Sequence, residues 1–313
     1  MRAAVISELG RPPELADRPE PSGETIIEVS AVSLNPIDIN VGAGRHFAGH
    51  PEFPYVPGCE GVGRAPDGTR VYLFSDGLGL SRDGLLAERG AAPASLGIPL
   101  PDAVSDEIAA ACGIAGMAGW MSVAWRAPVR TDDRVLVLGA TSTVGLVATQ
   151  VAKLLGAERV VAVGRNPDRL KRAAELGADV TVRLEEHDLA AAFKEAAGGD
   201  GPTHIVDTLW GPPAAAAIQA ASPGYRFVQL GQSAGAEAAL ASAAIRGKMG
   251  EIYGYIDFAV PAETFREQYL RLVGHAAAGE IVFDIETYPF ERVAEAWERQ
   301  AAGANAKLVV TLA

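Results

Sequence analysis

The sequence predicts an α/β protein of two domains, a mainly β domain and a doubly wound parallel sheet. Its length of 313 residues corresponds to about two domains of ~150 residues each. The first hundred residues hold short β-like runs broken by proline and glycine. From Arg134 onward, apolar runs of strand length alternate with segments of helical spacing. Hydrophobic residues make up 49% and charged residues 21%, which is ordinary for a globular protein and excludes disorder throughout.

The mainly β domain begins the chain. The runs TIIEVSAVSL (25–34), EGVGRA (60–65) and TRVYLF (69–74) are bounded by turn sequences rich in Gly, Asp and Pro. We expect these strands to form a small distorted barrel within residues 1–125. A helix or a pair of helices at 106–125 leads into the next domain.

The doubly wound sheet is predicted over residues 126–258. The run RVLVLGA (134–140) has the length of a buried strand, and helical spacing follows it at 144–157. Strands joined through helices run parallel, because the crossover helix returns the chain to the same edge of the sheet. Residues 259–313 add two helices and a last strand that do not continue the alternation. We therefore expect this tail to return to the first domain.

The composition limits the compartment and the partners. A net charge of −12 repels phosphate backbones, so we expect no nucleic-acid partner. Two cysteines, Cys59 and Cys112, are too few for a disulfide framework. So few cysteines fit a reducing compartment. The acidic Glu8 in the N-terminal segment argues against a secretory signal, and we therefore expect a cytoplasmic protein. The uncharged stretch between Glu107 and Arg126 is short and rich in Ala and Gly, so we interpret it as a buried helix and expect no membrane span.

A glycine-containing turn follows the first strand of the parallel sheet. Such a turn directs backbone N–H groups toward a diphosphate at a helix N-terminus, where the helix dipole favours negative charge. Gly139 permits the tight turn and Gly145 lets the helix pack close to the strand. Ser142 stands where the dinucleotide fingerprint has a glycine; its Cβ crowds the pyrophosphate, although its hydroxyl could donate to it. The strand before and the helix after favour a dinucleotide site over a simple glycine-rich turn, with the residues Gly139, Ala140, Thr141, Ser142, Thr143, Val144 and Gly145.

The end of the second strand indicates which dinucleotide binds. An NAD site usually carries Asp or Glu there to accept hydrogen bonds from the ribose hydroxyls. Here Gly164 is followed by Arg165, and Arg169 lies one turn along the next helix. Guanidinium groups suit a 2′-phosphate, so the sequence favours NADP(H). The alternative is that both arginines are solvated surface residues.

The sequence resembles a family from end to end. It is similar to the zinc-independent medium-chain dehydrogenases/reductases of the quinone oxidoreductase or enoyl reductase type. The resemblance implies a GroES-like catalytic domain, a Rossmann domain and a cleft between them that holds NADPH. It rests on the order and spacing of Asn35–Asp38, Pro57–Gly63, Gly116–Trp120, Arg134–Gly145, Ala174–Asp179, Val206–Asp207, Leu230–Gly231 and Tyr288–Pro289.

The positions that bind catalytic zinc in related enzymes argue against a metal here. Those relatives use three protein ligands and leave one position open. The corresponding positions hold Asn35, Cys59 and Ile114, of which only the cysteine is a good zinc ligand. We therefore expect no metal, and we interpret Cys59 as a small buried apolar residue.

Without a metal or flavin motif, the nicotinamide cofactor must supply the chemistry. The expected reaction is hydride transfer to a quinone or an α,β-unsaturated carbonyl, whose oxygen then needs a hydrogen-bond donor or a proton source. Candidate residues are Asn35, at a position where relatives also have Asn, His46, where relatives have a tyrosine, and Tyr55. The alternatives are a turn residue before Pro36 for Asn35 and an exposed loop histidine for His46.

The resemblance also implies contacts on the nicotinamide side and an assembly. Relatives bring backbone next to the nicotinamide ribose at Gly231, Gln232 and Ser233. We expect Tyr255 to support the nicotinamide ring or an oligomer edge, and Asn305 to close over the cofactor. Relatives often pair through the edge of the Rossmann sheet, so a homodimer is expected. Two alternative functions stay open, an enoyl-thioester reductase and a catalytically silent NADPH-binding protein.

Overall fold

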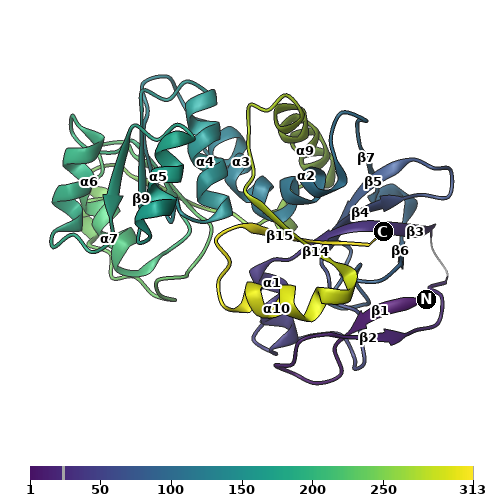
Figure 1. Ribbon diagram of the computed structural model, residues 1–313. Coiled ribbons are helices and arrows are strands. Elements are labelled where there is room, and N and C mark those ends of the chain that lie inside the picture. The colour runs from purple at the N-terminus through teal and green to yellow at the C-terminus, as the bar shows by residue number, and fades with distance from the viewer. Residues whose placement is uncertain (23–24, 313) are drawn as a thin grey trace. The chain divides into compact units, whose positions relative to one another are not determined.

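Figure 1 shows a computed structural model of the protein, which describes residues 1–22 and 25–312. The chain forms two compact units. Unit 1 comprises Met1–Ala115, Tyr269–Ala278 and Phe283–Ala313, and unit 2 comprises Gly116–Gln268 and Gly279–Val282. A sheet-rich unit and a parallel-sheet unit confirm the predicted α/β class.

The unit borders differ from the expected 1–125, 126–258 and 259–313. One border falls at Gly116, inside the helical stretch 106–126, and another at Tyr269, inside helix α9 (Ala262–Ala277). A border inside a helix carries no turn sequence, so the amino-acid pattern could not show it.

Unit 2 is built on a six-stranded sheet in which all neighbouring strands run parallel. Its strand order is β10-β9-β8-β11-β12-β13, so the order reverses between β8 and β11. In such sheets ligands bind at the carboxyl ends of the strands beside this reversal. The strands are β8 (Arg134–Leu138), β9 (Arg159–Gly164), β10 (Val180–Arg183), β11 (His204–Asp207), β12 (Arg226–Gln229) and β13 (Glu251–Gly254).

Helices connect these strands. The pair α6 and α7 packs together, and α4 packs on α3. The side chains between the sheet and the pair α6 and α7 are apolar, and Leu136, Val161, Ile205 and Phe227 among them are completely buried. The helices are α3 (Met117–Met121), α4 (Thr143–Leu154), α5 (Pro167–Glu175), α6 (Leu189–Ala197), α7 (Gly211–Ala220) and α8 (Ser242–Arg246), with a 3-10 turn η4 (Asp257–Ala259).

Unit 1 holds a seven-stranded sheet. Strand β15 (Lys307–Thr311) pairs antiparallel with β3 (Thr25–Ser33), so the tail shares a sheet with the first hundred residues. The order is β14-β15-β3-β4-β5-β7, with β6 also on β3, and β1 and β2 form a separate pair. The other elements are β1 (Arg2–Val5), β2 (Glu14–Asp17), α1 (Pro36–Gly42), β4 (Glu60–Arg64), β5 (Arg70–Phe74), β6 (Arg89–Ala92), η1 (Ala94–Leu96), β7 (Ile98–Pro99), β14 (Ile285–Pro289), η5 (Phe290–Arg292) and α10 (Val293–Ala301).

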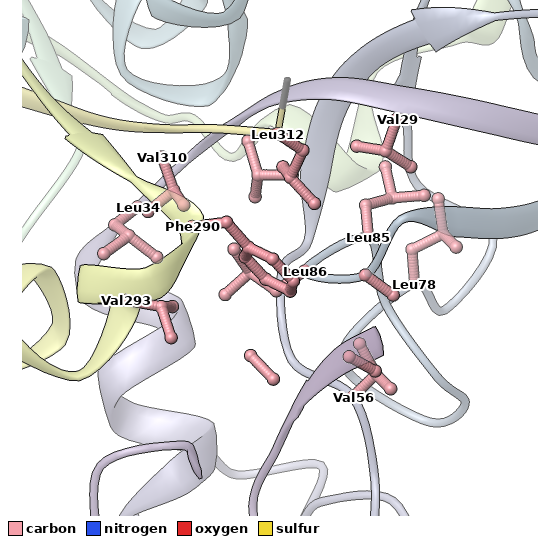
Figure 2. Close-up of a cluster of buried hydrophobic side chains, with 14 of the residues drawn as sticks. Val29, Leu34, Val56, Leu78, Leu85, Leu86, Phe290, Val293, Val310 and Leu312 are labelled. Carbon is pink, nitrogen blue, oxygen red and sulfur yellow. The ribbon is translucent and has the colours of Figure 1, made fainter. Parts of the chain in front are cut away.

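The core of unit 1 joins segments far apart in the sequence. Figure 2 shows Val29 and Leu34 near the start of the chain together with Phe290, Val310 and Leu312 near its end. These side chains are at most 8% exposed. Their burial, at about 25 cal/mol per Å² of apolar surface, holds the tail to the first domain.

The helical stretch 106–126 is the one described segment long and apolar enough to cross a membrane. Its 21 residues comprise α2 (Asp106–Ala111), the π-helical turns η2 (Cys112–Gly116) and η3 (Ser122–Arg126), and α3 between them. Within the protein, 72% of its most apolar window is buried. That burial agrees with a core helix, as the sequence predicts.

Candidate cofactor site

The turn after β8 requires glycine at both ends. Gly139 has a φ of +80°, and a Cβ there would overlap the hydroxyl of Thr208. A Cβ on Gly145 would overlap the carbonyl oxygen of Gly139. The first turn of α4 therefore lies directly against the end of β8, as a phosphate-binding turn requires.

Ser142 closes this turn from inside. Its hydroxyl donates to the carbonyl oxygen of Gly139 at 2.8 Å and accepts from the N–H of Gly145 at 3.1 Å, which makes Ser142 the N-cap of α4. The Ser142 hydroxyl thus already donates its hydrogen within the turn. It would have to break this bond to donate to a pyrophosphate, as expected from the sequence. A serine followed by a helical segment is an N-cap signal that the sequence interpretation missed.

Three backbone N–H groups of the turn have no acceptor among the described residues. They belong to Thr141, Thr143 and Val144, the last two being the first two residues of α4. A helix cannot satisfy its own first N–H groups, and its dipole adds positive potential there. These donors are what a diphosphate needs.

Thr208 brings the predicted cofactor segments of the two halves of the sheet together. A Cβ on Gly231 would lie 2.7 Å from the carbonyl oxygen of Thr208, and the Ser233 hydroxyl donates to the same oxygen at 3.2 Å. On its other side, Thr208 contacts Gly139, and its hydroxyl donates to the Leu138 carbonyl oxygen at 3.0 Å. Thr208 was not among the residues predicted from the sequence, although it directly follows β11.

Asp207 fixes the backbone on which Thr208 sits. Its carboxylate accepts from the N–H groups of Leu209 and Trp210 at 2.9 and 3.0 Å. Burial raises the pKa of Asp207 to about 6, and these two backbone donors oppose the rise. Asp207 thus shapes the turn after β11.

The residues predicted to read the 2′-phosphate lie beside the same turn. A Cβ on Gly164 would overlap the Thr141 side chain, and Arg169 donates from Nε to the Thr141 carbonyl oxygen at 3.4 Å. Asn166 caps α5 by accepting from the N–H groups of Asp168 and Arg169. Arg165 is exposed, with no hydrogen bond or ion pair to the described parts of the chain.

A pocket of about 700 Å³ opens at the ends of β12 and β13, entirely within unit 2. The predicted residues Gly231, Gln232 and Tyr255 line it. The Tyr255 hydroxyl donates to Asp257 at 2.7 Å, and burial raises the pKa of Tyr255. Trp125 approaches the Tyr255 ring edge-on at 6.4 Å between centroids. The full lining is Trp125, Arg126, Gln229, Leu230, Gly231, Gln232, Gly254, Tyr255, Ile256, Ala259 and Val260.

In unit 1, a completely buried carboxylate organises the residues around Asn35. Glu60 is 0% exposed and forms an ion pair of 3.4 Å with Lys307, which is 3% exposed. Its oxygens also accept from other groups of unit 1, namely the Asn35 amide at 2.7 Å, the Tyr72 hydroxyl at 2.6 Å, the Ile114 N–H at 2.6 Å and the Ser33 hydroxyl. A buried charge is tolerated when it is paired and hydrogen-bonded in this way.

This network engages the amide of Asn35 fully. Its Nδ2 donates to Glu60 and to the Ser33 carbonyl oxygen, and its Oδ1 accepts from the Lys307 ammonium at 2.5 Å. To donate to the substrate oxygen, as expected from the sequence, the Asn35 amide would have to break its hydrogen bond to Glu60. The structure instead shows Asn35 as a member of the buried network and as the N-cap of α1.

The other candidate catalytic residues have different environments. Tyr55 is 1% exposed in the hydrophobic core, and this burial raises the pKa of its hydroxyl and disfavours the predicted role at the substrate. His46 is half-buried, and its Nδ1 lies 3.3 Å from the Ala48 N–H. Its ring packs at 4.5 Å on Phe47, which is 90% exposed. Asn305 is exposed just before β15 and stays a prediction.

The zinc-ligand positions do not fit a metal. Asn35 and the Ile114 N–H are bonded to Glu60. Burial raises the pKa of the Cys59 thiol. The backbone N–H of Cys59 donates to Asp38 at 3.0 Å. Within residues 1–22 and 25–312, no three His, Cys, Asp or Glu side chains are grouped to hold an ion.

Comparison with known proteins agrees with this architecture. A family model described as "Zinc-binding dehydrogenase" matches residues 143–274, a range that excludes Asn35, Cys59 and Ile114. The chain is 26% identical over 326 residues to human quinone oxidoreductase, covering 100% of this chain and 98% of that protein. It is also 26% identical over 333 residues, 99% of the chain, to a phenolphthiocerol/phthiocerol polyketide synthase of Mycobacterium tuberculosis, of whose length it spans 15%.

Solved structures give the same result. The quinone oxidoreductase from Thermus thermophilus, solved also with NADPH, matches with a TM-score of 0.83 and 27% identity over 100% of both chains. An NAD-dependent alcohol dehydrogenase matches with a TM-score of 0.87 and 26% identity, again over 100% of both chains. In sequence and fold the chain is therefore similar to medium-chain dehydrogenases/reductases of the quinone oxidoreductase-like type.

The buried pair predicts a specific stability pattern. Lys307→Met leaves the Glu60 carboxylate without its countercharge and should lower the free energy of unfolding by about 3–5 kcal/mol. Adding Glu60→Gln removes the uncompensated charge, so the double variant should lose less than the two single variants together. Urea titration followed by fluorescence measures both effects.

The matched control is Lys171→Met on α5, where the side chain is exposed; a change within about 0.5 kcal/mol is expected there. A Lys307→Met variant as stable as this control would show that the ammonium does not compensate Glu60.

Proposed function

We propose that the protein is a metal-free, NADPH-dependent reductase that transfers hydride to a quinone or an α,β-unsaturated carbonyl compound. The observation that carries this proposal is the turn of Gly139–Gly145, which leaves three backbone N–H groups for a diphosphate where the strand order reverses. The quinone oxidoreductase relatives support the substrate class, and the structural relative solved with NADPH supports the cofactor.

The bound cofactor supplies a hydride from its nicotinamide ring. In the proposed reaction the acceptor gains this hydride at carbon and a proton at oxygen or at the neighbouring carbon, and NADPH becomes NADP⁺. In this proposal the turn after β8 together with Gly231 and Gln232 binds and orients the dinucleotide, and Gly231 and Gln232 form the cofactor side of the pocket at the ends of β12 and β13. His46 is the proposed hydrogen-bond donor to the acceptor's oxygen, because Nδ1 accepting from the Ala48 N–H leaves the hydrogen on Nε2. In this proposal the proton that the product gains comes from solvent.

The proposal of a metal-free reaction rests on residue chemistry. An amide engaged by Glu60 and Lys307, a buried thiol and an isoleucine occupy the three positions where relatives bind zinc. These three groups do not form a set of ligands that binds a zinc ion in competition with water. In the proposed reaction, hydrogen-bond donors therefore stabilise the negative charge that develops on the acceptor's oxygen.

Arg165→Ala should weaken NADPH binding about tenfold or more and leave NADH binding within about twofold. The reason is that a guanidinium contributes charge-assisted bonds only to the 2′-phosphate. Tryptophan fluorescence titration with each cofactor gives the two dissociation constants.

As a control, Arg246→Ala removes an equally exposed arginine of unit 2 and should change neither constant. Equal losses for NADPH and NADH in Arg165→Ala would remove Arg165 as the phosphate reader.

An enoyl-thioester reductase is the second candidate. It is favoured by the match of 99% of the chain to part of a polyketide synthase. The acidic net charge of −12 opposes it, since a phosphopantetheine or coenzyme A chain is anionic.

Turnover on a panel of acceptors decides between these functions. Absorbance of NADPH is followed with a neutral quinone, a cyclic enone and crotonyl coenzyme A. We expect faster oxidation with the first two, and we expect His46→Phe to slow turnover at least tenfold while NADPH affinity is unchanged.

Faster reduction of the thioester would favour the second candidate. Tight NADPH binding without turnover on any acceptor would favour a catalytically silent binding protein. A Phe47→Ala variant is the control for disturbance of the His46 loop.

We also propose a cytoplasmic homodimer that forms through the edge strand β13. Beside and on this strand Met249 and Ile252 are 81% and 38% exposed, and an exposed strand edge with apolar side chains favours pairing with a second copy. Sedimentation equilibrium should give the mass of two chains, and of one chain for Ile252→Glu. Leu154→Glu, at a position with the same 38% exposure, should stay dimeric; a dimeric Ile252→Glu would exclude this edge.

A further inference from the structure

The pocket at the ends of β12 and β13 has one charged side chain in its described lining, Arg126. The other lining residues are apolar, aromatic, amide-bearing or glycine. No carboxylate belongs to this described lining, although acidic residues outnumber basic ones in the chain by 39 to 27. The pocket is therefore locally basic, although the protein as a whole is acidic.

Arg126 is held in one orientation by two contacts. Its Nε donates to the carbonyl oxygen of Gly254 at 3.0 Å. Its guanidinium carbon lies 4.6 Å from the centroid of the Tyr253 ring, a cation–π geometry. The planar group is thus fixed before any ligand arrives, which lowers the entropic cost of binding.

The remaining donors of Arg126 are available. Its two Nη atoms form no hydrogen bond or ion pair with residues 1–22 or 25–312. Two neighbouring guanidinium N–H groups match the two oxygens of a carboxylate. Trp125, Ile256 and Val260 line the same pocket, and they offer apolar surface for a carbon skeleton.

We propose that Arg126 is a specificity-determining residue that binds a carboxylate on the acceptor, so that the preferred substrates are carboxylated enones or quinones. This inference rests on the proposed reductase function, because it places the acceptor in this pocket. The cofactor's own phosphates are the other source of an anion, and the experiment separates the two.

A matched acid and ester test the selectivity. The acceptors are 3-benzoylacrylate and its methyl ester, which carry the same enone. For the wild-type protein, kcat/KM should be at least tenfold higher for the acid, as expected for a charge-assisted hydrogen bond. In Arg126→Gln the kcat/KM for the acid divided by the kcat/KM for the ester should fall at least tenfold. In Arg246→Gln this ratio should not change.

A binding measurement keeps the inference testable without turnover. Calorimetry with the saturated acid 4-oxo-4-phenylbutanoate and the NADP⁺-loaded protein should show a Kd at least tenfold weaker in Arg126→Gln, with NADPH affinity changed less than twofold. Acid binding without NADPH oxidation would contradict the reductase function but keep the anion site. Equal acid affinity in both proteins, no acid binding, or a parallel loss of NADPH affinity would overturn the proposal.

Discussion

The proposed function of unit 2 depends on backbone N–H groups that have no acceptor within residues 1–22 and 25–312. They lie at the start of α4 because Ser142 caps the helix from inside the turn and because Gly139 and Gly145 let the helix approach the end of β8. Thr208 then joins this turn to the segment around Gly231. A dinucleotide bound across the reversal of strand order would contact both halves of the sheet, as the proposed function requires.

Unit 1 depends on a different interaction, the burial of Glu60 against Lys307. Charge compensation and four further donors make this carboxylate tolerable in the core. The same bonds engage Asn35 and Ile114, two of the three positions that correspond to zinc ligands in relatives. Two of these three positions are thus bonded to an internal ion pair, an arrangement that supports the proposed metal-free reaction.

The sequence was most informative where the signal is local. The run of four apolar residues before Gly139, and the helical spacing after it, predicted β8, α4 and the turn between them. Contacts between distant residues were not visible. Nothing near Asn35 indicates that Lys307, 272 positions later, donates to it, and no local pattern shows that Tyr55 points into the core. Thr208 was missed for the same reason, because its importance comes from contacts to Gly139 and Gly231.

Calorimetry of NADPH binding with a Thr143→Pro variant tests the central claim most directly. Proline is tolerated as the first residue of a helix, and Ser142 before it is already extended at φ −86° and ψ 165°. The variant therefore removes one proposed phosphate donor and keeps α4. We predict one molecule of NADPH per wild-type chain and an affinity about tenfold lower in the variant at unchanged stability. No heat of binding for the wild-type protein with NADPH or NADH, or equal affinity in the two proteins, would contradict the account.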